Sequence, residues 1–217
     1  MVKPNSSTRR STKALPAPDL ETRERILAAA HAVFTRKGTA GSRTQEIADE
    51  AGVNKALVHY YFGTKAALAD AIFEQALAAI TPKMFGILAD PGRTLEEKIP
   101  ALVQEQIDFH STRPYFAGYL VSELHAEPER VRRLVARRGR IPLDVLRRQL
   151  REGQRAGKFR PISAEQFVVT MMGLLIFSFA ARPALRELLG LDDAAWQAFV
   201  EERRRFLPGF IMAGLRP

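Results

Sequence analysis

The stretch SRTQEIADEAGVNKALVHYYFG, residues 42–63, decides the fold of this chain. Ser42, followed at the third position by Gln45, predicts a capping box, the signature of a helix start. Gly52 predicts the end of that helix about two turns later, and Asn54 predicts the N-cap of the next one. Two short helices joined by a tight glycine turn are the sequence form of a helix-turn-helix.

The second of these helices has an inner and an outer face. Val58 and Phe62 are one turn apart and are expected in the core, whereas Tyr61 is expected to have a mixed role. The outward positions are Lys55, Ala56, Leu57, His59 and Tyr60. Small and apolar side chains permit close approach to a major groove about 12 Å wide, while polar side chains reach phosphates and base edges. The pattern therefore predicts a recognition helix.

Longer amphipathic helices flank this pair. Upstream, apolar residues recur at helical spacing from Ile26 to Phe34, and Gly38 is expected to end that helix. Downstream, Thr64 predicts the N-cap of a helix that runs to about Met84. The arrangement predicts a three-helix DNA-binding domain that a fourth helix joins to the rest of the chain.

The remainder of the chain also reads as helices. Pro128 fits the first turn of a helix. Ser163 predicts the N-cap of an apolar helix over residues 164–181, and Asp192 or Asp193 begins the last helix. Because no alternating strand pattern interrupts these segments, the expected fold class is all-α.

The expected organisation has three parts. Residues 1–18 form a disordered basic tail, residues 19–80 a helix-turn-helix DNA-binding domain, and residues 81–217 a helical domain for ligand sensing and dimerisation. The basic residues of the tail are Lys3, Arg9, Arg10 and Lys13. The tail either lies along a minor groove or phosphates, or stays solvated, and the solvated state is favoured.

The composition excludes several classes of protein. The chain has 217 residues, a net charge of +9 and no cysteine, so disulfide scaffolds and thiolate chemistry are excluded and an acidic partner gains weight. The most apolar run, residues 167–181, is shorter than the roughly 20 residues of a membrane span. The N-terminus has no apolar signal segment. We expect a cytoplasmic protein without a membrane partner, a cofactor or a metal site.

The longer run TRERILAAAHAVFTRKGTAGSRTQEIADEAGVNKALVHYYFGTKAAL, residues 22–68, resembles the DNA-binding domain of the TetR family of bacterial one-component regulators. The core at residues 47–53 and the segment Tyr61-Phe62-Gly63-Thr64-Lys65 carry the resemblance, which covers roughly the first 80 residues. It implies a transcriptional repressor that binds a palindromic operator in double-stranded DNA as a homodimer. A small-molecule effector is then expected to release it.

The resemblance also implies two groups of DNA contacts. Positions near bases are Gln45, Ala56, Leu57 and His59, and positions near phosphates are Thr44, Lys55, Tyr60, Tyr61 and Lys65. The first turn of a helix independently favours phosphate, because its backbone N–H groups are free. His59 departs from the tyrosine more usual in the family, and Gln45 from the frequent basic residue, so the operator sequence stays open.

The second domain gives weaker expectations. Aromatic and sulfur-containing side chains suggest a ligand pocket, and a wide apolar surface on the last long helices suggests a dimer face. The pocket candidates are Phe109, Phe116, Tyr119 and Met172. The dimer candidates are Phe167, Met171, Leu174, Leu175, Phe199, Phe206 and Phe210. The alternative for both sets is ordinary core packing, and the last helix is expected to have Phe206 and Phe210 on its inner side.

Residues 130–160 carry twelve lysine and arginine residues against Asp144 and Glu152 alone. One interpretation is an anion site, for an acidic effector or for further nucleic acid. The other is a solvated helix face, which is favoured because the arginines from Arg147 to Arg155 fall opposite leucines at helical spacing.

Two alternatives to a ligand-responsive regulator stay open. An architectural DNA-binding protein would bind many sequences without an effector. A helical enzyme is the less favoured alternative, because the sequence has no P-loop, no dinucleotide-binding glycine motif and no nucleophile elbow.

Overall fold

The computed structural model describes residues 19–217, and the predicted disordered tail, residues 1–18, lies outside the described residues. Every regular element in residues 19–217 is a helix, so the predicted all-α class is confirmed. The elements are α1 (Leu20–Gly41), α2 (Thr44–Glu50), α3 (Lys55–Phe62), α4 (Lys65–Ala89), α5 (Leu95–Thr112), α6 (Phe116–Ala126), α7 (Pro128–Arg138), α8 (Asp144–Arg155), α9 (Ala164–Ala180), α10 (Arg182–Leu189) and α11 (Asp193–Leu215).

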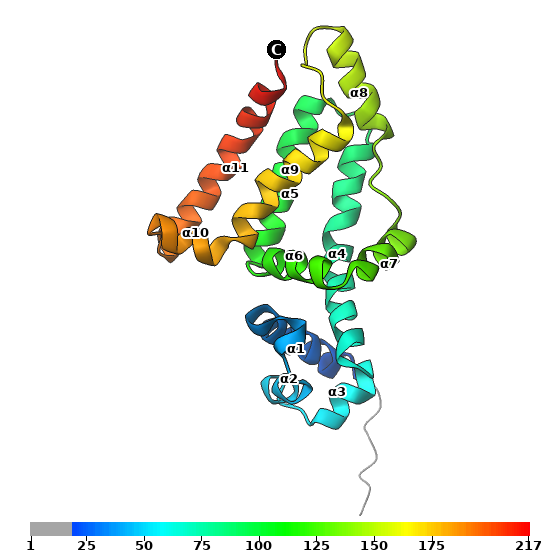
Figure 1. Cartoon of the computed structure of the whole chain (residues 1–217), viewed down its shortest axis with the longest axis vertical. Helices are drawn as coiled ribbons and strands as arrows, with labels where there is room; N and C mark the ends of the chain where they lie inside the picture. The colour runs from blue at the N-terminus through cyan, green and yellow to red at the C-terminus, as the bar shows by residue number, and fades with distance from the viewer. Residues whose placement is uncertain (1–18) are drawn as a thin grey trace, which may run out of the picture.

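The helices form a small body and a larger one, and α4 runs through both (Figure 1). The small body, which we call the reader, consists of α1, α2, α3 and the first half of α4. Leu68 and Phe73 of α4 are buried in the reader core, whereas Leu88 belongs to the core of the larger body. The boundary expected between residues 80 and 81 therefore falls inside a continuous helix.

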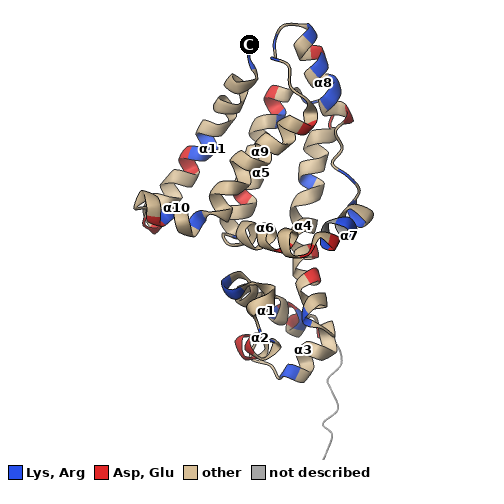
Figure 2. Cartoon of the chain, in the orientation of Figure 1, with Lys and Arg blue, Asp and Glu red and all other residues tan. Residues whose placement is uncertain are grey.

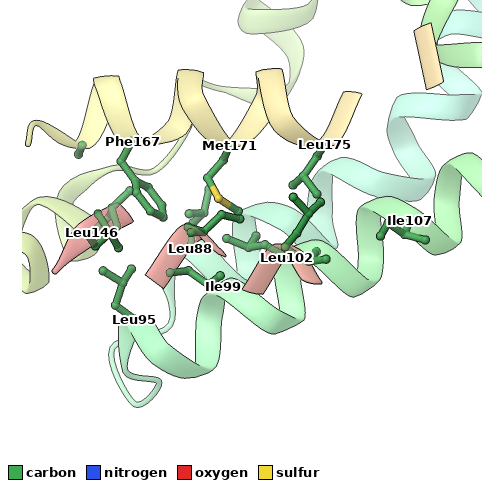
Figure 3. Packing of buried hydrophobic residues seen from close by; sticks show 14 of the residues in the cluster. Leu88, Leu95, Ile99, Leu102, Ile107, Leu146, Phe167, Met171 and Leu175 are labelled. Carbon is green, nitrogen blue, oxygen red and sulfur yellow. The ribbon is translucent and has the colours of Figure 1, made fainter. Parts of the chain in front are cut away.

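The core of the larger body lies between α5, α9 and their neighbours. Phe167, Met171 and Leu175 point from α9 toward α5, where Ile99 and Leu102 meet them (Figure 3). The three α9 residues are spaced by four positions, so they form one buried stripe. α11 adds Trp196, Val200, Leu207, Ile211 and Leu215 to this core.

Two local predictions in the reader concern helix ends. Gly38, which was expected to end the first helix, does break its helical geometry with a φ of 69°, a value that glycine adopts without strain, but α1 continues beyond it to Gly41. The capping box predicted at Ser42 and Gln45 is wrong: α2 begins one residue later, with Arg43 at the N-cap and its backbone N–H donating to Glu46 Oε2 at 3.0 Å. Ser42 instead donates its hydroxyl to the Thr39 carbonyl.

Two helix ends also differ from the prediction. α4 continues to Ala89 instead of ending near Met84, because Leu88 packs into the core of the larger body. The apolar helix α9 ends at Ala180, and a separate helix, α10, begins at Arg182. Proline in the first turn suits a helix start, and Pro183 lies in the first turn of α10.

α4 has the length and the apolar composition of a membrane-spanning helix, with a mean hydropathy of 1.2 over its best window. α9 and α10 have that length and apolar composition only when they are taken together, and the two helices are bent by 72° relative to each other. The buried residues of α4 and α9 pack against other helices of the chain. The apolar stripes of α4 and α9 therefore have partners within the protein.

Candidate nucleic-acid interface

The turn between α2 and α3 sets the direction of the second helix. Gly52 adopts a φ of 63°, and the Val53 N–H donates to the Ala48 carbonyl at 3.0 Å. The Asn54 side chain then accepts from the Leu57 N–H at 2.8 Å, which caps α3 as predicted. Val58 is buried against the reader core, so the opposite face of α3 is directed outward.

Most of the predicted outer face of α3 is accessible. Lys55, Ala56, His59 and Tyr60 are exposed, and Leu57 is half-buried. Phe62, expected in the core, is only half-buried; its ring packs on the edge of the reader core with the Arg23 guanidinium above it. The exposed surface therefore begins at the N-terminal turn of α3, the part that enters a groove in helix-turn-helix proteins.

His59 is held in one ring orientation. Its Nδ1 lies 2.8 Å from the Gly63 carbonyl oxygen, so Nδ1–H donates this bond. In the neutral ring, Nε2 is then an acceptor and faces away from the helix end. Such an acceptor suits the amino group of a cytosine or an adenine in the major groove.

Tyr61 and Lys65 are tied to the reader's own backbone. The Tyr61 hydroxyl accepts from the Asp19 N–H at 2.7 Å. The Lys65 ammonium donates to the carbonyls of Ser42 at 2.8 Å and Ala40 at 3.3 Å. These bonds join the start of α1 to α3 and the end of α1 to α4. The Tyr61 hydroxyl and the Lys65 ammonium therefore already make structural hydrogen bonds, and a phosphate contact by either group would have to coexist with them.

The first turn of α2 carries the remaining candidates. Thr44 is half-buried, and Gln45 is exposed with its amide donating to Asp49 Oδ1 at 2.8 Å. This bond between i and i+4 on an exposed helix is worth only about 0.2–0.5 kcal/mol, so a base edge can replace Asp49. Both residues are adjacent to the free backbone N–H groups at the helix start.

Arg43 is a residue of this surface that the sequence analysis missed. It is exposed at the N-cap of α2, and the nearby carboxylates are taken by other bases: Glu46 pairs with Lys37 at 2.6 Å and Glu50 with Arg36 at 2.8 Å. The Lys37 ammonium holds the pKa of Glu46 below its usual value. A basic residue directly before the first turn of α2 was the available signal.

The predicted ligand residues fall into a buried group and one exposed residue. Phe109, Phe116 and Tyr119 are buried in the reader core, where Tyr119 stacks on Phe34 with ring centroids 6.3 Å apart. Met172 is exposed on α9. Phe109 of α5 and the two α6 residues thus form an aromatic seam against the reader, because α6 packs on α1 where a pocket wall was expected.

An open hollow of about 490 Å³ lies between α4 and α5. Its lining includes Lys83 and Glu105, which form an ion pair at 2.7 Å, and Pro82, Gly86 and Gln104. None of the predicted ligand residues lines it.

The arginine-rich stretch of residues 130–160 is divided between two helices, and Figure 2 shows its basic residues gathered on α7 and α8. On α7, Arg130, Arg133, Arg137 and Arg138 pair with acidic residues of α4 and α6. On α8, Leu146 and Leu150 are buried, and Arg151 and Arg155 are exposed on the other side. The solvated-face interpretation therefore fits Arg151 and Arg155 of α8, whereas Arg130, Arg133, Arg137 and Arg138 of α7 form ion pairs with other helices.

The predicted dimer residues also fall into separate groups. Phe167, Met171 and Leu175 are buried in the chain's own core, and Leu174 and Phe199 pack at its edge. Phe206 and Phe210 are 55% and 51% exposed, so their expected position on the inner side of α11 is wrong. The two rings stack on each other at 5.2 Å on the outer side of that helix.

The exposed aromatic pair on α11 has counterparts on α9. Val169 and Phe177, which the sequence analysis missed, are 64% and 63% exposed, and Met172 is also exposed. The periodic apolar pattern predicted that both helices are largely apolar, but periodicity alone does not distinguish the side that packs inward from the side that is left open.

Comparison with protein families matches both parts of the chain. A model described as bacterial regulatory proteins of the tetR family matches residues 26–72. A model described as a tetracyclin repressor-like C-terminal domain matches residues 96–210.

Individual proteins match over nearly the whole chain. The chain is 30% identical over 204 residues to the HTH-type transcriptional repressor NicS of Pseudomonas putida, covering 90% of this chain and 92% of that protein. Among solved structures, SCO4942 from Streptomyces coelicolor has a TM-score of 0.63 at 27% identity, covering 90% of this chain and 99% of that one. The ketosteroid transcriptional regulator KstR2 of Mycobacterium tuberculosis shares the fold, with a TM-score of 0.65 at 17% identity and coverage of 93% and 97%.

Proposed function

Because this chain belongs to the TetR family of bacterial regulatory proteins and is a DNA-binding transcriptional regulator, we propose that it represses transcription as a homodimer on a palindromic operator and is released by a small-molecule effector. The observation that carries the proposal is the exposed outer face of α3, capped by Asn54 and supported from behind by Val58. The proposal includes a cytoplasmic location and no catalytic activity.

In the proposed complex, α3 enters the major groove. Ala56 and Leu57 make close apolar contacts, and His59 and Gln45 reach base edges. Lys55, Tyr60 and Thr44 contact phosphates, with Arg43 added at the start of α2 and with Tyr61 and Lys65 contributing where their internal bonds permit. The exposed and half-buried positions of these residues support the assignment.

Two copies are needed because one reader offers few base contacts. A symmetric pair places its two recognition helices about 34 Å apart, one turn of DNA. We assign the interface to the outer sides of α9 and α11, where Val169, Met172, Phe177, Phe206 and Phe210 are exposed. Exposed apolar side chains concentrated on two neighbouring helices are typical of a protein interface.

The effector acts by binding one arrangement of the readers better than another. A ligand that prefers the arrangement unsuited to DNA lowers operator affinity by its differential affinity for the two states. A coupling of about 1–3 kcal/mol, the usual range, changes affinity roughly 5- to 150-fold. The aromatic seam of Phe109, Phe116 and Tyr119 connects the larger body to the reader and supports a role in transmitting this change.

The proposal is tested by selecting bound sequences from random duplex DNA with the purified full-length protein. We expect an enriched inverted repeat, and affinity for it that falls steeply as salt concentration rises. Repeating the binding measurement with a panel of metabolites identifies an effector by loss of binding. If the selection enriches no inverted repeat and the protein binds many sequences with similar affinity, the architectural alternative is supported instead.

Two substitutions separate the roles within the reader. Lys55→Ala is expected to weaken binding to all duplexes alike and to reduce the salt dependence, because it removes a phosphate contact. Gln45→Ala is expected to relax the preference at one base position while leaving non-specific affinity unchanged. Equal effects of both variants across all sequences contradict the assignment.

A further inference from the structure

α7 grips α4 through arginine side chains that emerge on one side of the helix. Arg133 donates to both carboxylate oxygens of Asp70, each at 3.2 Å. Arg137 and Arg138 both reach Glu74, also at 3.2 Å. Asp70 and Glu74 are one turn apart on α4, so α7 follows a single acidic edge of that helix.

The centre of this network is buried. Arg130 Nη1 donates to Glu123 Oε2 at 2.9 Å, and both side chains are almost fully buried, at 6% and 5% exposure. Arg130 Nε lies 3.1 Å from Asp70, and its guanidinium lies 5.6 Å from the centre of the Phe73 ring. Arg130 therefore joins α7 to α6 and to α4 at once.

The network lies at the junction of the two bodies. Phe73 lies between Asp70 and Glu74 in the sequence of α4 and is buried in the reader core, with its ring centroid 6.5 Å from that of Phe116 on α6. In Figure 1, α7 lies against α4 just above the reader, at the level where α4 leaves the larger body. The ion pairs between α7 and α4 therefore lie close to the point where the reader begins.

We propose that Arg130, Arg133, Arg137 and Arg138 with Asp70, Glu74 and Glu123, together the α7 brace, set the reader's angle and thereby the half-site spacing that the dimer accepts. The inference rests on the proposed function. The four arginines are positioning residues: they act through α4 and not by touching DNA. Three carboxylates compensate most of the charge of the four arginines, which distinguishes the brace from the anion site considered for this stretch.

The physical basis is a network whose members differ in strength. Exposed ion pairs contribute little one at a time, but the guanidinium fork makes several directional bonds and the buried Arg130–Glu123 pair anchors the rest. Removing one partner of that buried pair is strongly destabilising. The more accessible residues Asp70 and Glu74 are therefore the positions to change.

The first experiment measures binding of full-length Asp70→Asn/Glu74→Gln to the selected operator and to versions with one base pair added or removed between the half-sites. Wild-type protein is expected to prefer one spacing by about tenfold or more, since a mismatched register loses base contacts. The variant is expected to lose most of that preference while retaining non-specific affinity. Glu165→Gln, which removes an exposed ion pair with Arg147 in the larger body, is the control and should behave as wild type.

Charge reversal provides the rescue. Glu74→Arg alone is expected to lose spacing preference, and its combination with Arg137→Glu and Arg138→Glu is expected to restore it. If Glu74 acts only through local packing, the added Arg137→Glu and Arg138→Glu substitutions should not restore the spacing preference. Where the triple variant is too unstable to purify, Glu74→Arg with Arg137→Glu alone gives a smaller charge reversal at the same contact.

A second experiment measures the reader's angle without DNA. The chain has no cysteine, so Ala28→Cys on α1 and Arg151→Cys on α8, both exposed, give a unique pair of spin labels. With labelled chains diluted into unlabelled protein, the distance distribution is expected to be narrow with native α7 and broad in Asp70→Asn/Glu74→Gln. If the variant leaves both the distance distribution and the spacing preference unchanged, the brace proposal is overturned. If the wild-type protein selects no operator, that result counts against the proposed function, and the distance measurement alone then tests the brace.

Discussion

Among single side chains, two ionisable residues of α5, His110 and Lys98, are buried inside the protein. His110 is almost fully buried, its Nδ1 has no hydrogen-bond partner within residues 19–217, and its ring stacks on Phe179 at 5.0 Å. Lys98 is fully buried, and its ammonium donates to the Leu88 carbonyl and to Gln149 Oε1, each at 2.9 Å. Burial lowers the pKa of both groups.

His110 gives a prediction about pH. Burial, and secondarily Arg113, lowers its pKa from 6.5 to about 4. Because the unfolded chain binds the proton more readily, stability is present above pH 6.5 and is lost as the pH falls toward 4. We expect the free energy of unfolding to fall between pH 7 and pH 5 by about 2 kcal/mol more in wild type than in His110→Phe.

Urea unfolding at the two pH values, followed by circular dichroism, measures this difference. His125→Phe, at an exposed histidine of α6, is the control and should retain the wild-type pH dependence. The same dependence in His110→Phe and wild type contradicts the buried, neutral state of His110.

The sequence predicted the residues of the reader better than those of the larger body. The caps formed by Asn54 and Thr64 depend on side chains within three positions of the N–H groups they bind, so a short window of sequence contains both partners. Lys98 and Gln149 are 51 positions apart, and Tyr61 is 42 positions from Asp19. No local pattern indicates such pairs.

At the scale of elements, α3 depends on its cap because it is short. α3 has 8 residues, too few to be stable without tertiary contacts and terminal hydrogen bonds. The cap on Leu57 N–H lies in the turn that is proposed to enter the groove. Stability and recognition are therefore linked at this helix end.

Asn54→Ala is expected to lower the free energy of unfolding by about 0.5–2 kcal/mol and also to weaken operator binding, since the first turn of α3 frays. Thr94→Ala removes the equivalent cap of α5, far from the reader in sequence. It should destabilise the protein to a similar degree with little change in operator affinity. Thermal unfolding and DNA titration of both variants distinguish these outcomes, and equal loss of binding in both argues against a specific role for the α3 cap.

Helix periodicity predicted the existence of most elements but not their partners. The α7 arginines meet Glu74 across 63 or 64 positions, so these ion pairs became visible only in three dimensions. The Phe206 and Phe210 pair follows a spacing that fits an inner or an outer stripe equally well. In α11 the inner stripe is filled by Leu207, Ile211 and Leu215, which leaves the two phenylalanines outside.

At the scale of the whole molecule, the proposed dimer determines operator binding. Phe206→Asp/Phe210→Asp places charge on an interface that would otherwise exclude water, and burying an unpaired carboxylate is strongly unfavourable. We expect this variant to sediment as a monomer and to bind the palindrome about tenfold or more weakly, with affinity close to that for a single half-site. Sedimentation velocity and DNA titration at the same protein concentration measure both effects.

Val121→Asp is the matched control for this test. Val121 is 52% exposed on α6, comparable with the two phenylalanines but on another helix. Its variant is expected to stay dimeric and to bind normally. A dimeric Phe206→Asp/Phe210→Asp protein refutes the assignment of the interface to α11.

The continuous course of α4 makes it a lever. Its 25 residues extend about 37 Å at 1.5 Å per residue. A tilt of about 5° at the end held by Leu88 moves the opposite end by about 3 Å, comparable with the length of one hydrogen bond. A disturbance too small to alter the core around Leu88 is therefore enough to take a side chain of α3 out of reach of its base.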